Sequence, residues 1–322
     1  MPVTPPPVSH HEVLPFAACT ADDWLPAIKT LPTSAFPNFT QLLQGMKLIH
    51  TDSGNALSLS PPHERVMARA LGLPLRDGLI PWAAWQQFQE RSASAGQAWA
   101  YLTPCHWAMG REHATLSDPA ALDLQADDSR TLLQAMQPYF ASGGITLHYA
   151  EPTRWLAEGE VFRTLPSASL DRVLGRNVDP WLPGTKEMRL LQNEMQMLLY
   201  THPLNDQRSA KGQLSVNSFW ISGSGALSNN FTPPPSPNVA LPRNLALPAF
   251  TSDWAAYTQA WAALDASDGA PLLALQQRGD TLRLSLCGER NALTFETART
   301  SFFTKLSNIF SLQPFSALLE QL

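Results

Sequence analysis

Apolar residues recur at helical spacing in several stretches of the chain. The longest stretch covers residues 186–200, and its apolar face consists of Met188, Leu191, Met195, Leu198 and Leu199. This helix is expected to end near His202, because a proline disfavours the α conformation in the residue before it. Further helices are predicted over residues 38–48, 60–72 and 127–143, after Pro81, and around Trp254 and Trp261.

Alternating apolar and polar positions predict strands between these helices. Residues 281–287 alternate, and a turn at 288–291 leads to a second strand that ends near Glu296, which predicts a hairpin. Other strands are expected near Trp99 and Tyr101 and over residues 145–149, 154–157 and 216–221. The fold class is therefore mixed α/β: a helix-rich N-terminal part, a central mixed sheet with covering helices, and a C-terminal hairpin with helices.

Proline-rich stretches suggest where the chain divides. Residues 1–12 are expected to form a flexible arm in which His10 and His11 are solvated, since repeated prolines remove backbone donors. Residues 229–248 have the composition of a linker or surface strap. The expected regions are thus a helical or mixed region over 13–125, a central α/β region over 126–228, and a C-terminal α/β region over 249–322.

The charge balance excludes several partners. The formal net charge is -5, from 22 basic and 27 acidic residues, and no Lys/Arg block is available to neutralise the phosphates of a nucleic acid. No apolar run is long enough to span a bilayer, and the first residues resemble neither a signal nor a transit peptide. A cytoplasmic protein that binds no nucleic acid and no membrane is expected.

The three cysteines favour buried, reduced thiols. Cys19, Cys105 and Cys287 lie far apart, which fits neither a disulfide framework nor a zinc site. An activated Cys105 beside His106 is the alternative. Neighbouring residues on a strand point to opposite faces, which argues against that pairing.

Residues 202–225 concentrate polar groups beside apolar structure, as small-molecule sites do. The planar guanidinium of Arg208 matches the two oxygens of a carboxylate or phosphate, and Asn205 and Asn217 would orient such a ligand. A turn at residues 223–225 would add backbone donors in an anion nest. The structural alternative is that Arg208 pairs with an acidic neighbour while the asparagines satisfy the backbone.

Two other groups are weaker candidates. His106, Glu112 and His113 offer a histidine–carboxylate set for acid–base work or, alternatively, a half-buried polar cluster. His50 and Asp52 flank a hydroxyl and imitate a metal site, although a helix end followed by a turn is the preferred interpretation. No metal site and no cofactor are predicted.

Three segments resemble a known family. The stretch NEMQMLLYTHPLNDQRSAKGQLSVNSFWISGSG, residues 193–225, resembles bacterial RpfE-type regulatory proteins, many of which are labelled phosphoglycerate mutase-like. WAYLTPCHWAMGREHATL and GRNVDPWLPG resemble further signatures of that family, so the likeness covers residues 81–225. A segment of archaeal-type cofactor-independent phosphoglycerate mutases is similar more distantly. There, a His-Pro-x-Asn and Arg element precedes an Asn-x-Ile-Trp strand and a Gly-x-Gly turn.

This resemblance implies ligand contacts at Arg208 and Asn217, with His202 and Asn205 behind them. The surface expected to bind the ligand or partner also includes Trp220. The mutases need two metal ions held by Asp and His clusters, which this sequence lacks. The first hypothesis is therefore a non-catalytic regulatory protein that binds a small phosphorylated or carboxylated metabolite or a protein partner. The alternatives are a metal-dependent phosphoglycerate mutase-like or phosphatase-like enzyme and a scaffold that uses its tryptophans at interfaces.

Overall fold

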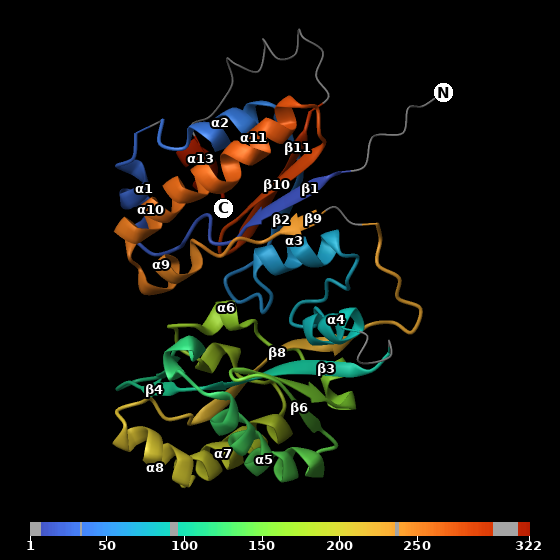
Figure 1. Ribbon diagram of the computed structural model, residues 1–322, viewed down its shortest axis with the longest axis vertical. Coiled ribbons are helices and arrows are strands. Elements are labelled where there is room, and N and C mark those ends of the chain that lie inside the picture. The colour runs from blue at the N-terminus through green and yellow to red at the C-terminus, as the bar shows by residue number, and fades with distance from the viewer. Residues whose placement is uncertain (1–7, 33, 91–95, 236–237, 299–314) are drawn as a thin grey trace. The chain divides into compact units, whose positions relative to one another are not determined.

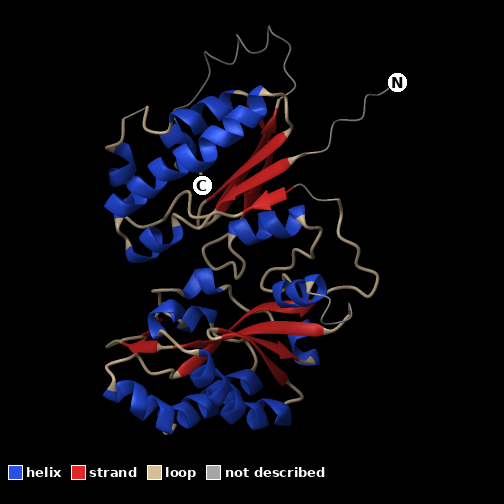
Figure 2. Ribbon diagram, in the orientation of Figure 1, coloured by secondary structure: helices blue, strands red, loops and turns tan. Residues whose placement is uncertain are grey.

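The computed structural model describes residues 8–32, 34–90, 96–235, 238–298 and 315–322. The chain divides into two compact units, and each combines a sheet with helices (Figures 1 and 2). Unit 1 comprises Met1–Ala56, Pro62–Gly72 and Pro233–Leu322, and unit 2 comprises Leu57–Pro61 and Leu73–Thr232. The mixed α/β class predicted from the sequence is confirmed. Among the residues described, no helix has both the length and the apolar character that crossing a bilayer requires.

Unit 1 is built on a five-stranded sheet. The strands lie in the order β2 (Met46–Ser53), β11 (Asn291–Thr297), β10 (Leu282–Cys287), β1 (His10–Leu14) and β9 (Asn238–Ala240). β1 pairs in parallel with both β10 and β9, whereas β10, β11 and β2 pair antiparallel. The hairpin expected in this part of the chain is β10–β11.

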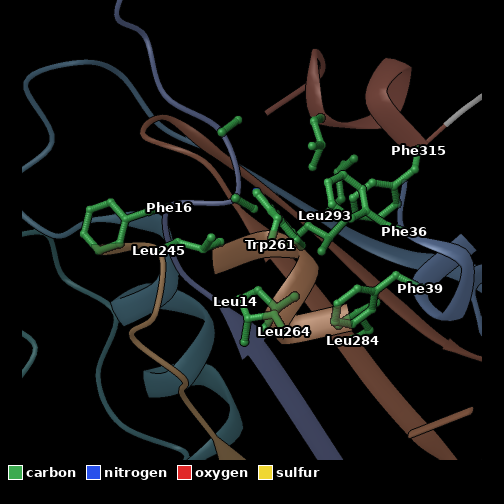
Figure 3. Close-up of a cluster of buried hydrophobic side chains, with 14 of the residues drawn as sticks. Leu14, Phe16, Phe36, Phe39, Leu245, Trp261, Leu264, Leu284, Leu293 and Phe315 are labelled. Atoms are coloured by element: carbon green, nitrogen blue, oxygen red, sulfur yellow. The ribbon is translucent and has the colours of Figure 1, made fainter. Parts of the chain in front are cut away.

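The main core of unit 1 lies between this sheet and a layer of helices. The layer contains α1 (Trp24–Lys29), α2 (Pro37–Gln44), α9 (Ala246–Thr251), α10 (Trp254–Leu264), the π-helical turn η4 (Asp265–Gly269), α11 (Ala270–Gln277) and α13 (Phe315–Leu319). Aromatic rings of Phe36, Phe39, Trp261 and Phe315 meet there, in a cluster that includes Leu284 of β10 (Figure 3). The helix α3 (Pro62–Ala70) contacts the strands through Val66, beside Val13 and Cys287.

Several predictions in unit 1 are wrong. The helix expected over residues 38–48 ends at Gln44, and residues 46–48 begin β2. The arm expected over residues 1–12 ends in β1, which lies inside the sheet between β10 and β9, so His11 is buried rather than solvated. Residues 1–7 lie outside the described residues. The segment with His50 and Asp52 belongs to β2 rather than to a turn, and Asp52 forms ion pairs with Arg65 and Arg69 of α3.

Unit 2 is built on a four-stranded antiparallel sheet. Its order is β6 (Thr146–Glu151), β7 (Arg154–Glu158), β3 (Ala98–Cys105) and β8 (Ser218–Ala226), and a separate hairpin joins β4 (Trp107–Met109) to β5 (Ala114–Leu116). The helices α5 (Ala126–Ser142) and α7 (Lys186–Tyr200) enclose its core. The other elements are α4 (Trp82–Gln89), η1 (Pro119–Leu122), η2 (Glu160–Arg163), α6 (Leu170–Val173), η3 (Asp179–Trp181) and α8 (Pro203–Ala210).

Helix α7 has the predicted bounds, and its first turn is capped by the hydroxyl of Thr185, which accepts from the amide of Met188. Two differences affect the candidate site. The connector expected at residues 202–208 is mostly helix α8, with Pro203 at its first position, where a missing N–H costs nothing. The turn expected at residues 223–225 lies inside β8, so the predicted anion nest does not form there.

Candidate functional site

Arg208 is buried and serves the architecture of unit 2. Its side chain is 1% exposed, its Nε donates to the carbonyl of Leu214 at 2.9 Å, and its Nη2 donates to the carbonyl of Leu122. The remaining Nη1 lies 3.8 Å from an Oδ of Asp128. The prediction that Arg208 binds a ligand is thereby corrected. Backbone carbonyls accept the hydrogen bonds that the oxygens of a ligand would otherwise accept, and the guanidinium connects α8 to the chain before α5.

The two asparagines also bind backbone. Asn205 accepts from the amide of Val216 and donates to the carbonyls of Leu199 and Val216. Asn217 forms the same kind of pair with Trp107, accepting from its N–H at 2.7 Å and donating to its carbonyl at 3.0 Å. The sequence-based alternative, in which these amides satisfy loop and strand backbones, describes both contacts.

His202 and Trp220 have structural partners as well. His202 caps α8, and its Nδ1 accepts from the amide of Leu204 at 3.2 Å. Trp220 is buried, and its Nε1 donates to the carbonyl of Ala168 at 3.0 Å. The void beside its ring has a volume of about 10 Å³, which is too small for a metabolite. The structure therefore does not gather the five predicted contacts around a ligand.

The cysteine and histidine at the end of β3 are not a catalytic pair. Burial raises the pKa of the Cys105 thiol well above its ordinary value, so the thiolate does not form near neutral pH. His106 Nδ1 lies 2.9 Å from the carbonyl of Ser215. Within the described residues, no hydrogen bond or ion pair joins the His106 side chain to Glu112 or His113.

Asn217, Glu112 and His113 do line one open hollow, here called the β4–β5 hollow. Its volume is about 530 Å³, and its walls come from the β4–β5 hairpin, from Asp179 in η3 and from the last turns of α7. The amide of Gly110 donates to the carbonyl of His113 at 3.0 Å and closes the hairpin turn. This turn places residues 111–113 at the rim, and Trp107 and Asn217 also line the hollow.

The β4–β5 hollow contains charged side chains of both signs. The side chains of Arg111, Glu112, His113 and Asp179 all line it and are exposed. In the part of the chain that the structure describes, none of the four forms an ion pair or a side-chain hydrogen bond. An arginine without an internal partner retains its donors for a ligand, unlike the buried Arg208.

Large apolar side chains surround the same hollow. Met109 is 79% exposed, Met197 is 67% exposed and Tyr200 is 80% exposed, and all three line the β4–β5 hollow. Leu190 is also exposed, seven residues before Met197 on the outer side of α7. The sequence contains this signal, since Leu190, Met197 and Tyr200 fall off the apolar face that packs into the core.

The tryptophans do not form such a surface. No tryptophan is among the exposed large apolar side chains of the described residues, and Trp155, Trp220 and Trp261 are fully buried. The scaffold hypothesis based on exposed tryptophans therefore lacks its surface. Among the residues described, no three His, Cys, Asp or Glu side chains gather as ligands for a metal ion.

Comparison with known proteins gives weak structural similarity. No family model matches the chain, and no curated protein matches it. The cofactor-independent phosphoglycerate mutase from Thermoplasma acidophilum DSM 1728 is 13% identical, with a TM-score of 0.38, over 98% of this chain and 99% of that chain. The PH0037 protein from Pyrococcus horikoshii is 10% identical, with a TM-score of 0.42, over 92% of this chain and 89% of that chain.

Proposed function

We propose that this chain is a non-catalytic regulatory protein of the RpfE type and that it binds its partner in the β4–β5 hollow. The expected occupant is a segment of a partner protein. It inserts an apolar side chain between Met109, Met197 and Tyr200 and places a carboxylate or phosphate beside Arg111. The observation that carries the proposal is the coincidence, at one hollow, of these exposed apolar side chains with a guanidinium that forms no ion pair within the described residues.

The exposed methionines and tyrosine favour a protein segment over a small metabolite. Exposed apolar side chains that cluster commonly mark interaction sites, because water contact with them is unfavourable. Methionine adapts its shape to different apolar partners, and tyrosine is common among residues that dominate binding energy. A small anion would use Arg111 but would leave Met109 and Tyr200 in water.

The charged rim defines the polar part of the occupant. Arg111 supplies a planar set of donors for an anionic group, and Glu112 and Asp179 supply acceptors for a basic group nearby. Because these rim charges are exposed, each contact is worth little alone but selects among sequences. The preferred segment therefore carries one apolar anchor between an acidic and a basic residue.

A selection from random-sequence displayed peptides tests the proposal. Peptides enriched on the full chain are expected to share an apolar anchor and an acidic residue. They should bind at least tenfold more weakly to Tyr200→Ala and about threefold more weakly to Arg111→Ala, since a contact to an exposed charge contributes less. The matched controls are Leu247→Ala and Arg278→Ala, which remove an exposed leucine and an exposed arginine of unit 1.

A parallel thermal-shift series with inorganic phosphate and 3-phosphoglycerate tests the metabolite alternative. If no peptide is enriched, and one of these anions stabilises the wild-type chain but not Arg111→Ala, the occupant of the hollow is a small anion and not a protein segment. Enriched peptides whose binding is unaffected by both hollow variants would move the site elsewhere and refute the proposal.

A further inference from the structure

The strand β2 forms one edge of the sheet in unit 1. It has eight residues and pairs antiparallel with β11 on one side. Within the described residues, no strand pairs with its other side. The unpaired N–H and C=O groups of such an edge are a template for another strand, so proteins commonly keep edge strands short or cover them. β9 at the opposite edge has only three residues.

The composition of β2 adds an apolar component to this edge. Five consecutive residues, 47–51, are exposed, although they lie within a strand. Leu48 is 51% exposed and Ile49 is 39% exposed. A long edge strand with two exposed aliphatic side chains is a template for another strand, and Lys47 is the one charged residue in the exposed run.

We propose that β2 is a self-association surface, where a second copy of this chain adds its own β2 antiparallel to the first. The pairing would continue the antiparallel ladder of β11 and β2 across a two-fold axis. Such an axis makes the contact self-complementary, because the same strand is offered by both copies and the assembly closes as a dimer. The proposal is independent of the β4–β5 hollow, which lies in unit 2.

The charges on β2 support a copy of itself as the occupant. With the axis at Ile49, the two isoleucines meet, Leu48 faces His50 of the second copy, and Lys47 faces Thr51 of the second copy. Lys47 is the only charged side chain in the exposed run, so this register brings no like charges together. An unrelated acidic segment would pair with Lys47, but its binding would not explain why Leu48 and Ile49 beside Lys47 are aliphatic and exposed.

Ile49 also occupies a special position in the ladder. The pairing with β11 shifts by one residue here, since His50 lies opposite Thr294 while Leu48 lies opposite Phe295. Ile49 is therefore the extra residue of a β-bulge, which leaves it unpaired on the β11 side and bends the strand locally. A substitution at this position changes the outer contact with little effect on the pairing to β11.

A charge-swap experiment tests the dimer. Sedimentation equilibrium of the full chain is expected to show a monomer–dimer equilibrium. Ile49→Arg alone and Ile49→Glu alone should each weaken dimerisation at least tenfold, because like charges then meet across the axis. An equimolar mixture of the two variants should recover a heterodimer, which a merely misfolded variant would not do.

Hydrogen exchange locates the contact. In the wild-type chain, amides of residues 46–53 should exchange more slowly as the protein concentration rises, whereas those of β1 should not change. Leu247→Arg is the matched control, since it charges an exposed leucine outside β2 and should leave the dimer intact. A chain that stays monomeric at all concentrations would refute the proposal. A dimer that both charged variants preserve would refute it as well.

Discussion

Acid should destabilise unit 1 through His11. This side chain is 3% exposed, and its Nε2 lies 2.8 Å from the hydroxyl of Ser285, which lies 2.8 Å from the hydroxyl of Thr294. Burial, followed by the nearby charges of Arg283 and His10, lowers the pKa of His11 from 6.5 to about 4. Between these two pKa values, His11 is mostly neutral in the folded chain and mostly protonated in the unfolded chain.

The sign and size of the effect follow from this difference. The pKa of His11 is lower in the folded chain than in the unfolded chain. The contribution of neutral His11 to the free energy of unfolding is therefore fully present above about pH 6.5 and is lost as the pH falls toward 4. The difference between these two pKa values corresponds to about 3 kcal/mol at the acid limit. At pH 5, where the unfolded histidine is mostly protonated, the expected loss is about 2 kcal/mol.

Urea denaturation at pH 8, 7, 6 and 5 measures this loss. Carboxylates also contribute to the pH profile, so the informative quantity is the difference between the wild-type chain and His11→Gln. The variant cannot gain a proton and should lose about 2 kcal/mol less free energy of unfolding between pH 8 and pH 5. His113→Gln, at an exposed position of unit 2, should follow the wild type. Parallel profiles for wild type and His11→Gln would refute this account of His11.

Two further predictions concern buried groups of unit 2. Arg208→Met should lower the free energy of unfolding by about 2–4 kcal/mol, since the carbonyls of Leu122 and Leu214 lose their donor, and a phosphate-induced thermal shift should be unchanged. Arg278→Met, at the surface of unit 1, is the matched control. If only Arg208→Met loses a thermal response to phosphate, Arg208 is a ligand contact and the structural role is refuted. The Cys105 thiol should react with a disulfide reagent only as fast as the protein unfolds, because burial raises its pKa; rapid reaction in the native protein would contradict this.

The elements that sequence patterns predicted well are those whose stability is local. Helix α7 has a continuous apolar face and a threonine cap, and the β10–β11 hairpin has alternation and a turn between its strands. Residues 10–12 of β1 were assigned to a flexible arm because they follow the proline-rich start of the sequence, and the partners of β1 lie more than 200 residues later. β2 was missed because an edge strand with a bulge shows no regular alternation.

The site residues were harder to predict, for a chemical reason. A guanidinium that binds two backbone carbonyls and one that binds a carboxylate require the same residue, so Arg208 alone does not distinguish these roles. The amide groups of Asn205 and Asn217 have the same ambiguity. The exposed residues of the β4–β5 hollow are easier to recognise in the sequence, because Met197 and Tyr200 lie outside the core-facing side of α7.

The way the two units share the chain determines when each of them can form during synthesis. Nearly all of unit 2 is continuous, from Leu73 to Thr232, and its strands find one another as soon as that segment has left the ribosome. β1 has emerged long before, but its parallel neighbours are residues 238–240 and 282–287. The strand β1 therefore lacks both of its neighbours until residues 238–240 and 282–287 have been synthesised, and during that interval its backbone groups are open to non-native pairing.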